Sequence, residues 1–192
     1  MPGNPLKLTD PRAMRALAHP ARIAIWAHLG LRGPATATEC AEVAGLSPSA
    51  CSYHLRALAK YGFVEEDPDS AADGRQRPWR ARVVAVETET GHDPAADVAA
   101  QFLVENVRVA VEELRAQFEG RRSEFPVEWQ RAAGGSTDVV HVTPAELTEL
   151  RRRIFELAGE YRRFEAAERP AGTLPVLLQY DAIPWFEPEE AR

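Results

Sequence analysis

The order of apolar and polar positions predicts a mainly helical chain with one short β segment. Between residues 9 and 61, apolar residues recur three and four positions apart, which is the spacing of an amphipathic helix. A first helix should start at Thr9 to Pro11 and a second at Pro20, because proline fits the first turn of a helix. Their predicted inner faces are Met14, Leu17 and Ala18 in the first helix and Ile23, Trp26 and Leu29 in the second. Residues 1–8 have no period and are expected to be a mobile tail.

Residues 38–63 have the pattern of two short helices joined by a tight turn. Gly45 should end the first helix, since glycine takes the left-handed conformation of a helix C-terminus without a steric cost. Ser47 is a good cap for the second helix, because its hydroxyl can accept a bond from a free backbone N–H, and Pro48 suits the first helical position. Gly62 should end that second helix. The stretch therefore predicts a helix-turn-helix.

The second of these helices has two different faces. Its apolar face should pack against the preceding helix and consists of Cys51, Leu55, Leu58 and Ala59. The opposite face carries small hydroxyls, a phenol and a guanidinium, which can bond to base edges or phosphates. Its members are Ser49, Ser52, Tyr53 and Arg56. An ordinary solvated face is the alternative interpretation.

A strand, a polar loop and a second strand are predicted after this helix. Residues 63–66 form the first strand and residues 79–87 its return. The loop 67–78 between them is the expected wing. Its arginines, Arg75 and Arg77, and Arg80 at the start of the return strand could touch phosphate or enter the minor groove. Aspartates in the first part of the loop would repel phosphate, so that part could equally be a solvated loop.

Two runs of the sequence resemble the winged helix-turn-helix of the ArsR family of bacterial transcription regulators: LAHPARIAIWAHLG and ATECAEVAGLSPSACSYHLRALAKYGFVEE. The resemblance covers residues 1–90 and implies that the helix after Ser47 is a recognition helix. Metal-sensing members carry paired cysteines on the preceding helix, whereas this chain has only Cys40 there, so the non-metal-sensing type is expected. The candidate DNA-binding residues are Ser47, Ser49, Ser52, Tyr53, Arg56, Lys60, Arg75 and Arg77.

A long helix is predicted over residues 95–119, after a linker at residues 91–94. Its apolar stripe is Leu103, Val107, Ala110, Leu114 and Phe118, widened by Val98, Phe102 and Val109. In ArsR-like proteins a helix after the wing pairs two subunits, which would set two recognition helices about 34–36 Å apart. The resemblance thus implies a dimer surface at Phe102, Leu103, Val107, Leu114 and Phe118. Packing of this helix only within its own chain is the alternative.

A second long helix is predicted from Thr143. The Thr143 hydroxyl can cap this helix, and Glu146 follows three residues later, which is the pattern of a capping box. Pro144 suits the first turn of the helix. The helix should run as far as residue 169, with a narrow apolar seam that suits packing along one other helix. The seam consists of Leu147, Leu150, Ile154, Leu157, Tyr161 and Phe164.

Irregular chain anchored by Trp129 is expected over residues 121–135. Strands are predicted over residues 138–142 and 174–180, and these could pair with each other. Large apolar side chains follow at residues 183–186. They could line a small-molecule pocket or cover an interface between helices or subunits.

Composition and charge fit a cytoplasmic, site-selective binding protein. The 192 residues are 45% hydrophobic, and no apolar run approaches the roughly twenty residues that a membrane span needs. The first residues lack the pattern of a signal peptide. Cys40 and Cys51 are expected to be reduced core thiols. The net charge of −6 disfavours indiscriminate binding to nucleic acid, because attraction to phosphate supplies the sequence-independent part of affinity.

We therefore predict a mainly α fold with a small β wing, in which residues 1–90 are a winged helix-turn-helix DNA-binding domain. Residues 91–192 would be a helical (α+β) region for dimerisation and for an effector. The predicted function is a transcription regulator that binds an inverted repeat in double-stranded DNA as a homodimer. A protein-interaction module without specific DNA binding is the alternative, which the negative charge keeps open. Since the sequence has no phosphate loop, nucleophile elbow or zinc motif, we expect no enzyme activity, cofactor, metal or membrane partner.

Overall fold

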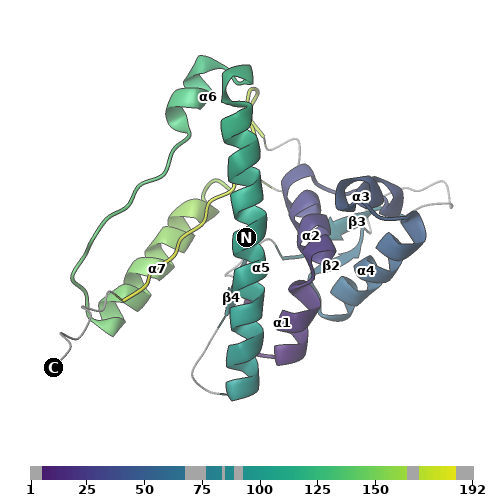
Figure 1. The fold of residues 1–192 in the computed structure, drawn as a ribbon, viewed down its shortest axis with the longest axis horizontal. Coiled ribbons are helices and arrows are strands. Elements are labelled where there is room, and N and C mark those ends of the chain that lie inside the picture. The colour runs from purple at the N-terminus through teal and green to yellow at the C-terminus, as the bar shows by residue number, and fades with distance from the viewer. Residues whose placement is uncertain (1–5, 68–76, 84, 89–92, 164–168, 185–192) are drawn as a thin grey trace.

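The structure is a computed structural model and describes residues 6–67, 77–83, 85–88, 93–163 and 169–184 (Figure 1). Its first half contains β1 (Leu6–Leu8), α1 (Pro11–Leu17), α2 (Pro20–Arg32), α3 (Ala37–Ala44), α4 (Pro48–Lys60), β2 (Val64–Glu66), β3 (Trp79–Ala81) and β4 (Val86–Thr88). Its second half contains α5 (Pro94–Gly120), the 3₁₀ turn η1 (Arg122–Glu124), α6 (Val127–Ala132) and α7 (Pro144–Gly159). Within the described ranges, no helix combines the length and the apolar character that crossing a membrane requires.

The short helices begin and end at residues whose chemistry suits a helix terminus. Asp10 caps α1 and His19 caps α2, each accepting a bond from a backbone N–H two residues further on, at 2.8 and 3.2 Å. Thr36 and Glu39 form a reciprocal capping box at the start of α3. Gly45 ends α3 with a φ of 64°, in the left-handed region. The predicted helix starts near residues 11 and 20 and the stop at Gly45 are confirmed.

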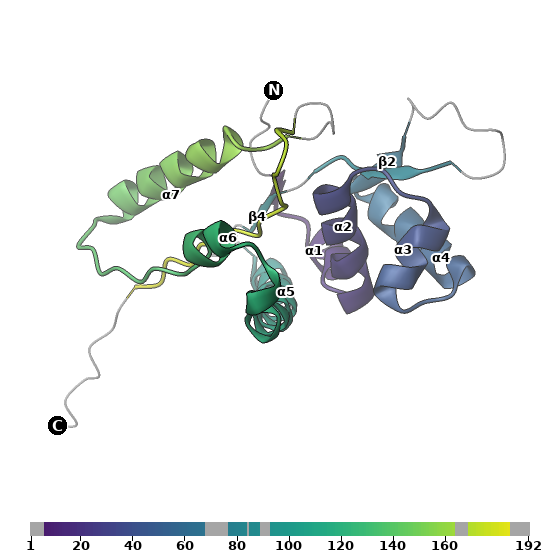
Figure 2. The same ribbon diagram turned by 90° about the horizontal axis from the view of Figure 1, so that it is seen from above.

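One hydrophobic core joins α1–α4 to the first half of α5. Its largest fully buried side chains include Met14, Leu17, Ile25, Leu55, Leu58 and Phe63. The long helix α5 lies against α1 and α2 (Figures 1 and 2). The buried residues at its start are small, namely Ala96, Ala99 and Ala100, so the backbones of α5 and α1 can approach closely. The first part of α5 is therefore held by its own chain.

The strands form two small sheets, which corrects two predictions. Strands β2 and β3 are antiparallel, with Val64 opposite Ala81, as a wing requires. Residues 6–8, predicted to be a mobile tail, form β1, which pairs in parallel with β4. Residues 1–8 contain too few apolar residues to show a period, so their pattern held no sign of a strand. Leu8 is nevertheless buried in the core. The predicted return strand 79–87 is divided, since β3 pairs with β2 and β4 turns to β1.

Two apolar stripes run along opposite faces of α5. Leu103 and Val107 belong to the stripe that faces the core, and Leu103 is buried there. Its predicted dimer contact is therefore corrected, because this side chain is already covered by its own chain. On the opposite face lies the outer stripe, which we define as Val98, Phe102 and Val109; the Phe102 residue is 56% exposed.

The far end of α5 reaches beyond the core. Leu114 is 43% exposed, and the Phe118 ring packs against the Phe125 ring at 5.2 Å. Residues 121–135 were predicted to be irregular but contain η1 and α6. Arg122 helps to order them by donating to the carbonyl of Gln130 at 2.7 Å. Because α6 is short and is held by side-chain to backbone hydrogen bonds, it has no repeating apolar pattern from which it could have been predicted.

The C-terminal arm, which we define as residues 133–163 and 169–184, has its helix α7 on the opposite side of α5 from α3 and α4 (Figures 1 and 2). The capping box of Thr143 and Glu146 at the start of α7 is confirmed. The helix ends at Gly159, earlier than predicted, and Phe164 of the predicted seam lies outside the described residues. Arg151 ties α7 to β4 through an ion pair with Glu87 at 2.8 Å.

The two strands predicted in the C-terminal arm are wrong. Residues 138–142 and 174–180 follow an extended course without strand pairing within the described chain. Their aliphatic side chains are exposed, with Val139 at 72%. Alternating apolar residues form a strand only where a second surface covers them, and the described residues do not supply that surface here. Of the terminal apolar group, Trp185 and Phe186 lie outside the described residues.

Replacing Leu103 with alanine tests how α5 is held. We expect Leu103→Ala to lower the free energy of unfolding by about 2–5 kcal/mol, because it leaves a cavity in the shared core. Leu114→Ala, on the exposed part of the same helix, should change it by less than about 0.5 kcal/mol. Denaturant unfolding measures both variants. Equal effects of the two substitutions would contradict the packing described for α5.

Candidate nucleic-acid interface

The helix α4 begins and ends as the sequence predicted. The Ser47 hydroxyl accepts a bond from the Ala50 N–H at 3.3 Å, and Pro48 occupies the first helical position. Gly62, just beyond the helix, has a φ of 74°, a conformation that favours glycine. Together with α3 and the Gly45 turn, α4 makes the helix-turn-helix. The two helices pack directly on each other.

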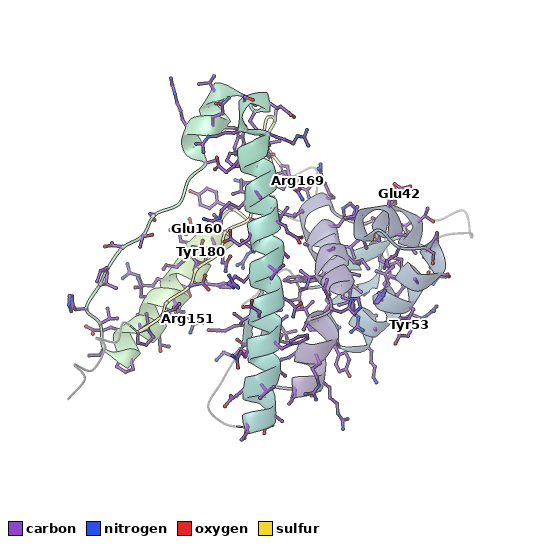
Figure 3. All side chains as sticks on the ribbon, in the orientation of Figure 1. Glu42, Tyr53, Arg151, Glu160, Arg169 and Tyr180 are labelled. Atoms are coloured by element: carbon purple, nitrogen blue, oxygen red, sulfur yellow. The ribbon has the colours of Figure 1, made fainter. Side chains whose placement is uncertain are left out.

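The two faces of α4 have opposite environments. Cys51, Leu55 and Leu58 are completely buried on the inner face. The outer face, which we define as Ser49, Tyr53, Arg56 and Lys60, is exposed over its whole length. Tyr53 is 61% exposed and lies on the side of the molecule away from α5 and the C-terminal arm (Figure 3). The outer face is thus free to meet another molecule.

The serines at the start of α4 also form bonds within the helix. The hydroxyls of Ser47 and Ser49 lie 3.1 Å apart, and either can be the donor. The Ser52 hydroxyl donates to the carbonyl of Pro48 at 2.9 Å, and its residue is half-buried. Since a hydroxyl keeps acceptor capacity after donating one bond, these groups can still accept a bond from a ligand donor. Ser47 and Ser49 are exposed.

Arginines at the base of the wing are paired with carboxylates. Arg80 of β3 contacts Glu65 of β2 at 2.8 Å and Asp67 at 3.5 Å. Arg77 contacts Glu66 at 3.2 Å, and its side chain is 74% exposed. An exposed ion pair of this kind contributes little free energy, so Arg77 can exchange its carboxylate for a phosphate. Arg75, the other predicted wing contact, lies outside the described residues.

A shallow hollow lies between α4 and the helices α1 and α2. We call it the α1–α4 hollow; its volume is about 570 Å³. Its lining comprises Arg12, Arg15, Ala16 and Arg22 on one side and Tyr53, Arg56, Ala57, Lys60 and Tyr61 on the other. The three arginines of α1 and α2 were not among the predicted site residues. Arg12 and Arg15 repeat at helical spacing on the outer face of α1, and this spacing is the signal that could have found them.

A histidine pair joins α2 to α4 at the edge of this region. The rings of His19 and His54 are 4.7 Å apart, and the Arg22 Nε donates to His54 Nδ1 at 3.3 Å. Burial lowers the pKa of His54, and the neighbouring His19 and Arg22 lower it further. The pKa of His19 is lowered by burial and then by Arg22. Both imidazoles are therefore held in the neutral form, and His19 has the structural, hydrogen-bonding role that we expected.

The two cysteines are buried, free thiols, as predicted. Burial, with a smaller contribution from Cys51, raises the pKa of Cys40 to about 12. A thiol with this pKa is protonated at neutral pH and is a poor metal ligand, because metals bind the thiolate. In the part of the chain that the structure describes, no three His, Cys, Asp or Glu side chains lie close enough together to hold a metal ion.

Comparison with known proteins agrees with this motif. A family model described as a helix-turn-helix domain matches residues 17–67. Among solved structures, the chain is similar to the homodimeric winged helix-turn-helix DNA-binding domain of a possible ArsR-family transcriptional regulator from Mycobacterium bovis. The identity is 27%, over 55% of this chain and 81% of that one, and the TM-score of 0.33 is too low to compare the folds. No curated protein matches the chain.

Acid should destabilise the chain through the histidine pair. Because folding lowers the pKa of His54 below its ordinary value of 6.5, the unfolded chain binds protons first as the pH falls. The stability that neutral His54 contributes is present above pH 6.5 and is lost as the pH falls through the lowered pKa. Denaturant unfolding from about pH 7.5 to about pH 5 measures this loss. His54→Gln, which keeps an acceptor for Arg22, should lose less stability over that range; an unchanged pH dependence would contradict the assignment.

Proposed function

Since residues 17–67 are a helix-turn-helix domain, we propose that this chain is a transcription regulator that binds specific sites in double-stranded DNA. The observation that carries the proposal is the exposed outer face of α4. It presents a hydroxyl, a phenol and two cationic groups, and the described part of the chain does not cover it. These groups match the hydrogen-bonding edges of bases and the charge of phosphates.

The placement of α4 supports entry into the major groove. An α-helix fits this groove, and recognition helices contact bases mainly with their first residues. The first turns of α4 carry Ser49 and Tyr53, and the cationic Arg56 and Lys60 follow. The β2–β3 hairpin comes directly after α4 and forms a wing that would contact the flanking backbone. In this arrangement the DNA would lie on the side of the molecule away from the C-terminal arm.

A homodimer is the second part of the proposal. The outer stripe of α5 is apolar and faces away from the chain's own core, so a second copy is a suitable cover for it. Of the predicted dimer residues, Phe102 lies in this stripe, and Leu114 and Phe118 lie on the projecting end of α5. A twofold axis between two paired copies of α5 would present two recognition helices to an inverted repeat. The cytoplasmic location and the absence of catalysis remain part of this proposal.

The C-terminal arm supports the alternative, a protein-interaction module. Its exposed aliphatic side chains include Val139, Val140, Val176, Leu178 and Ile183. Such side chains are suited to a protein partner or to a small apolar effector, which would make the regulator ligand-responsive. The two candidate functions differ in one simple test. A regulator should retard some DNA fragments flanking its own coding region in a gel shift, whereas a pure interaction module should retard none selectively.

Replacing Arg56 tests the proposed recognition face. Using a duplex selected from random sequences by the unmodified protein, we expect Arg56→Ala to weaken specific binding by about 1–3 kcal/mol, the cost of losing one bidentate base contact. Fluorescence anisotropy titration measures this loss. Arg131→Ala, an exposed arginine of α6, removes the same charge and should leave binding unchanged. Specific binding that is equal in the two variants would exclude Arg56 from the site.

Replacing Phe102 tests the proposed dimer surface. Phe102→Glu places a charge in the middle of the outer stripe, and burying an unpaired charge is costly, so the variant should be a monomer. Sedimentation equilibrium of the free protein measures the change. Gln101→Glu adds the same charge at a neighbouring exposed position and should assemble like the unmodified chain. A Phe102→Glu variant that remains dimeric would show that the outer stripe is not the interface.

A further inference from the structure

The α1–α4 hollow gathers positive charge in a protein whose net charge is −6. Five cationic side chains line it, and no carboxylate is among its lining residues. Three of them, Arg12, Arg15 and Arg22, come from helices outside the helix-turn-helix pair. The other two, Arg56 and Lys60, belong to the outer face of α4. The hollow is therefore a continuation of that face towards α1.

The cations of the hollow differ from many other arginines in that no acidic partner is found for them among the residues that the structure describes. Arg80, Arg108 and Arg121, for example, form ion pairs with glutamates at 2.7–2.8 Å. Within the described residues, no carboxylate pairs with any of the five cations of the hollow. Positive side chains that gather on one surface without a carboxylate create a positive potential that attracts anions. The charge pattern points to an anionic ligand.

Arg22 is held in place within the hollow. Its Nε donates to His54, and one of its terminal nitrogens donates to the carbonyl of Ala16. These two bonds fix the guanidinium between α1 and α4 before any ligand binds. Arg12 and Arg15 are exposed on the outer face of α1, one turn apart. The hollow thus combines one preorganised cation with several that can adapt.

The position of α1 beside α4 indicates which anion would be met. Packed helices lie about 8–10 Å apart, and the major groove is about 12 Å wide. When α4 occupies the groove, a helix packed against its side is carried over the sugar-phosphate strand at the groove's edge. The hollow is open and shallow, which suits a continuous strand better than a small enclosed anion.

We propose that the α1–α4 hollow binds the phosphate backbone of the same duplex whose major groove α4 enters, with Arg12, Arg15 and Arg22 as its backbone contacts. This inference rests on the proposed function. Contacts to phosphate position a protein on the duplex but carry no sequence information directly. The hollow therefore supplies salt-dependent affinity and fixes the angle of α4, and base selection is left to the outer face.

The test compares salt dependence in two doubly substituted proteins. Arg12→Gln/Arg15→Gln removes two charges from the hollow and leaves Arg22, which has a structural role, in place. Arg131→Gln/Arg153→Gln removes two charges from exposed positions on α6 and α7 and is the matched control. Binding to a selected duplex and to a random duplex is titrated over a series of potassium chloride concentrations, and thermal unfolding checks that both variants are folded.

Log K for DNA binding falls as log salt rises, and each phosphate contact contributes about 0.9 to the steepness of this fall. In the hollow variant the slope should therefore be less steep by about 1.8. Its ratio of specific to random affinity should stay unchanged. The control should keep the slope of the unmodified protein. A slope that is unchanged in the hollow variant, or reduced equally in the control, would overturn the inference and leave the proposed function standing. If the unmodified protein prefers no duplex, both fail together.

Discussion

The burial of one face of α4 is the constraint on which the site depends. Cys51, Leu55 and Leu58 are completely covered by the surrounding helices, and a helix is too stiff to turn one face inward without turning the other outward. The caps at Ser47 and Gly62 set where this rigid unit begins and ends. The direction of Tyr53 and Arg56 is therefore determined by apolar contacts on the opposite side of the helix and not by those side chains themselves.

Much of the first half could be predicted because its signals are local. A capping serine followed by proline, glycines at helix ends and apolar residues three and four apart each specify structure within a few residues. The helix-turn-helix, its two faces and the start of the wing all came from such signals. The structural role of His19 also came from its position, directly before the proline that opens α2. These features need no knowledge of distant parts of the chain.

The features that sequence reasoning missed depend on distant contacts. Strand β1 exists because residues 6–8 meet residues 86–88, far away in the sequence. Arg12 and Arg15 join the site only because α1 packs beside α4. Leu103 and Phe102 are neighbours in the sequence, yet one lies in the core and the other in the outer stripe, and only packing distinguishes them. In the C-terminal arm, apolar alternation predicted strands, but no strand of the described part of the chain pairs with those residues.

Cross-linking tests most directly whether the outer face of α4 enters the major groove. A photoreactive phenylalanine analogue placed at Tyr53 would be irradiated with a duplex that the protein has selected from random sequences. We expect cross-links to bases through their major-groove edges, at equivalent positions in each half of the site. Cross-links only to protein, or none to DNA although the duplex is bound, would contradict the account.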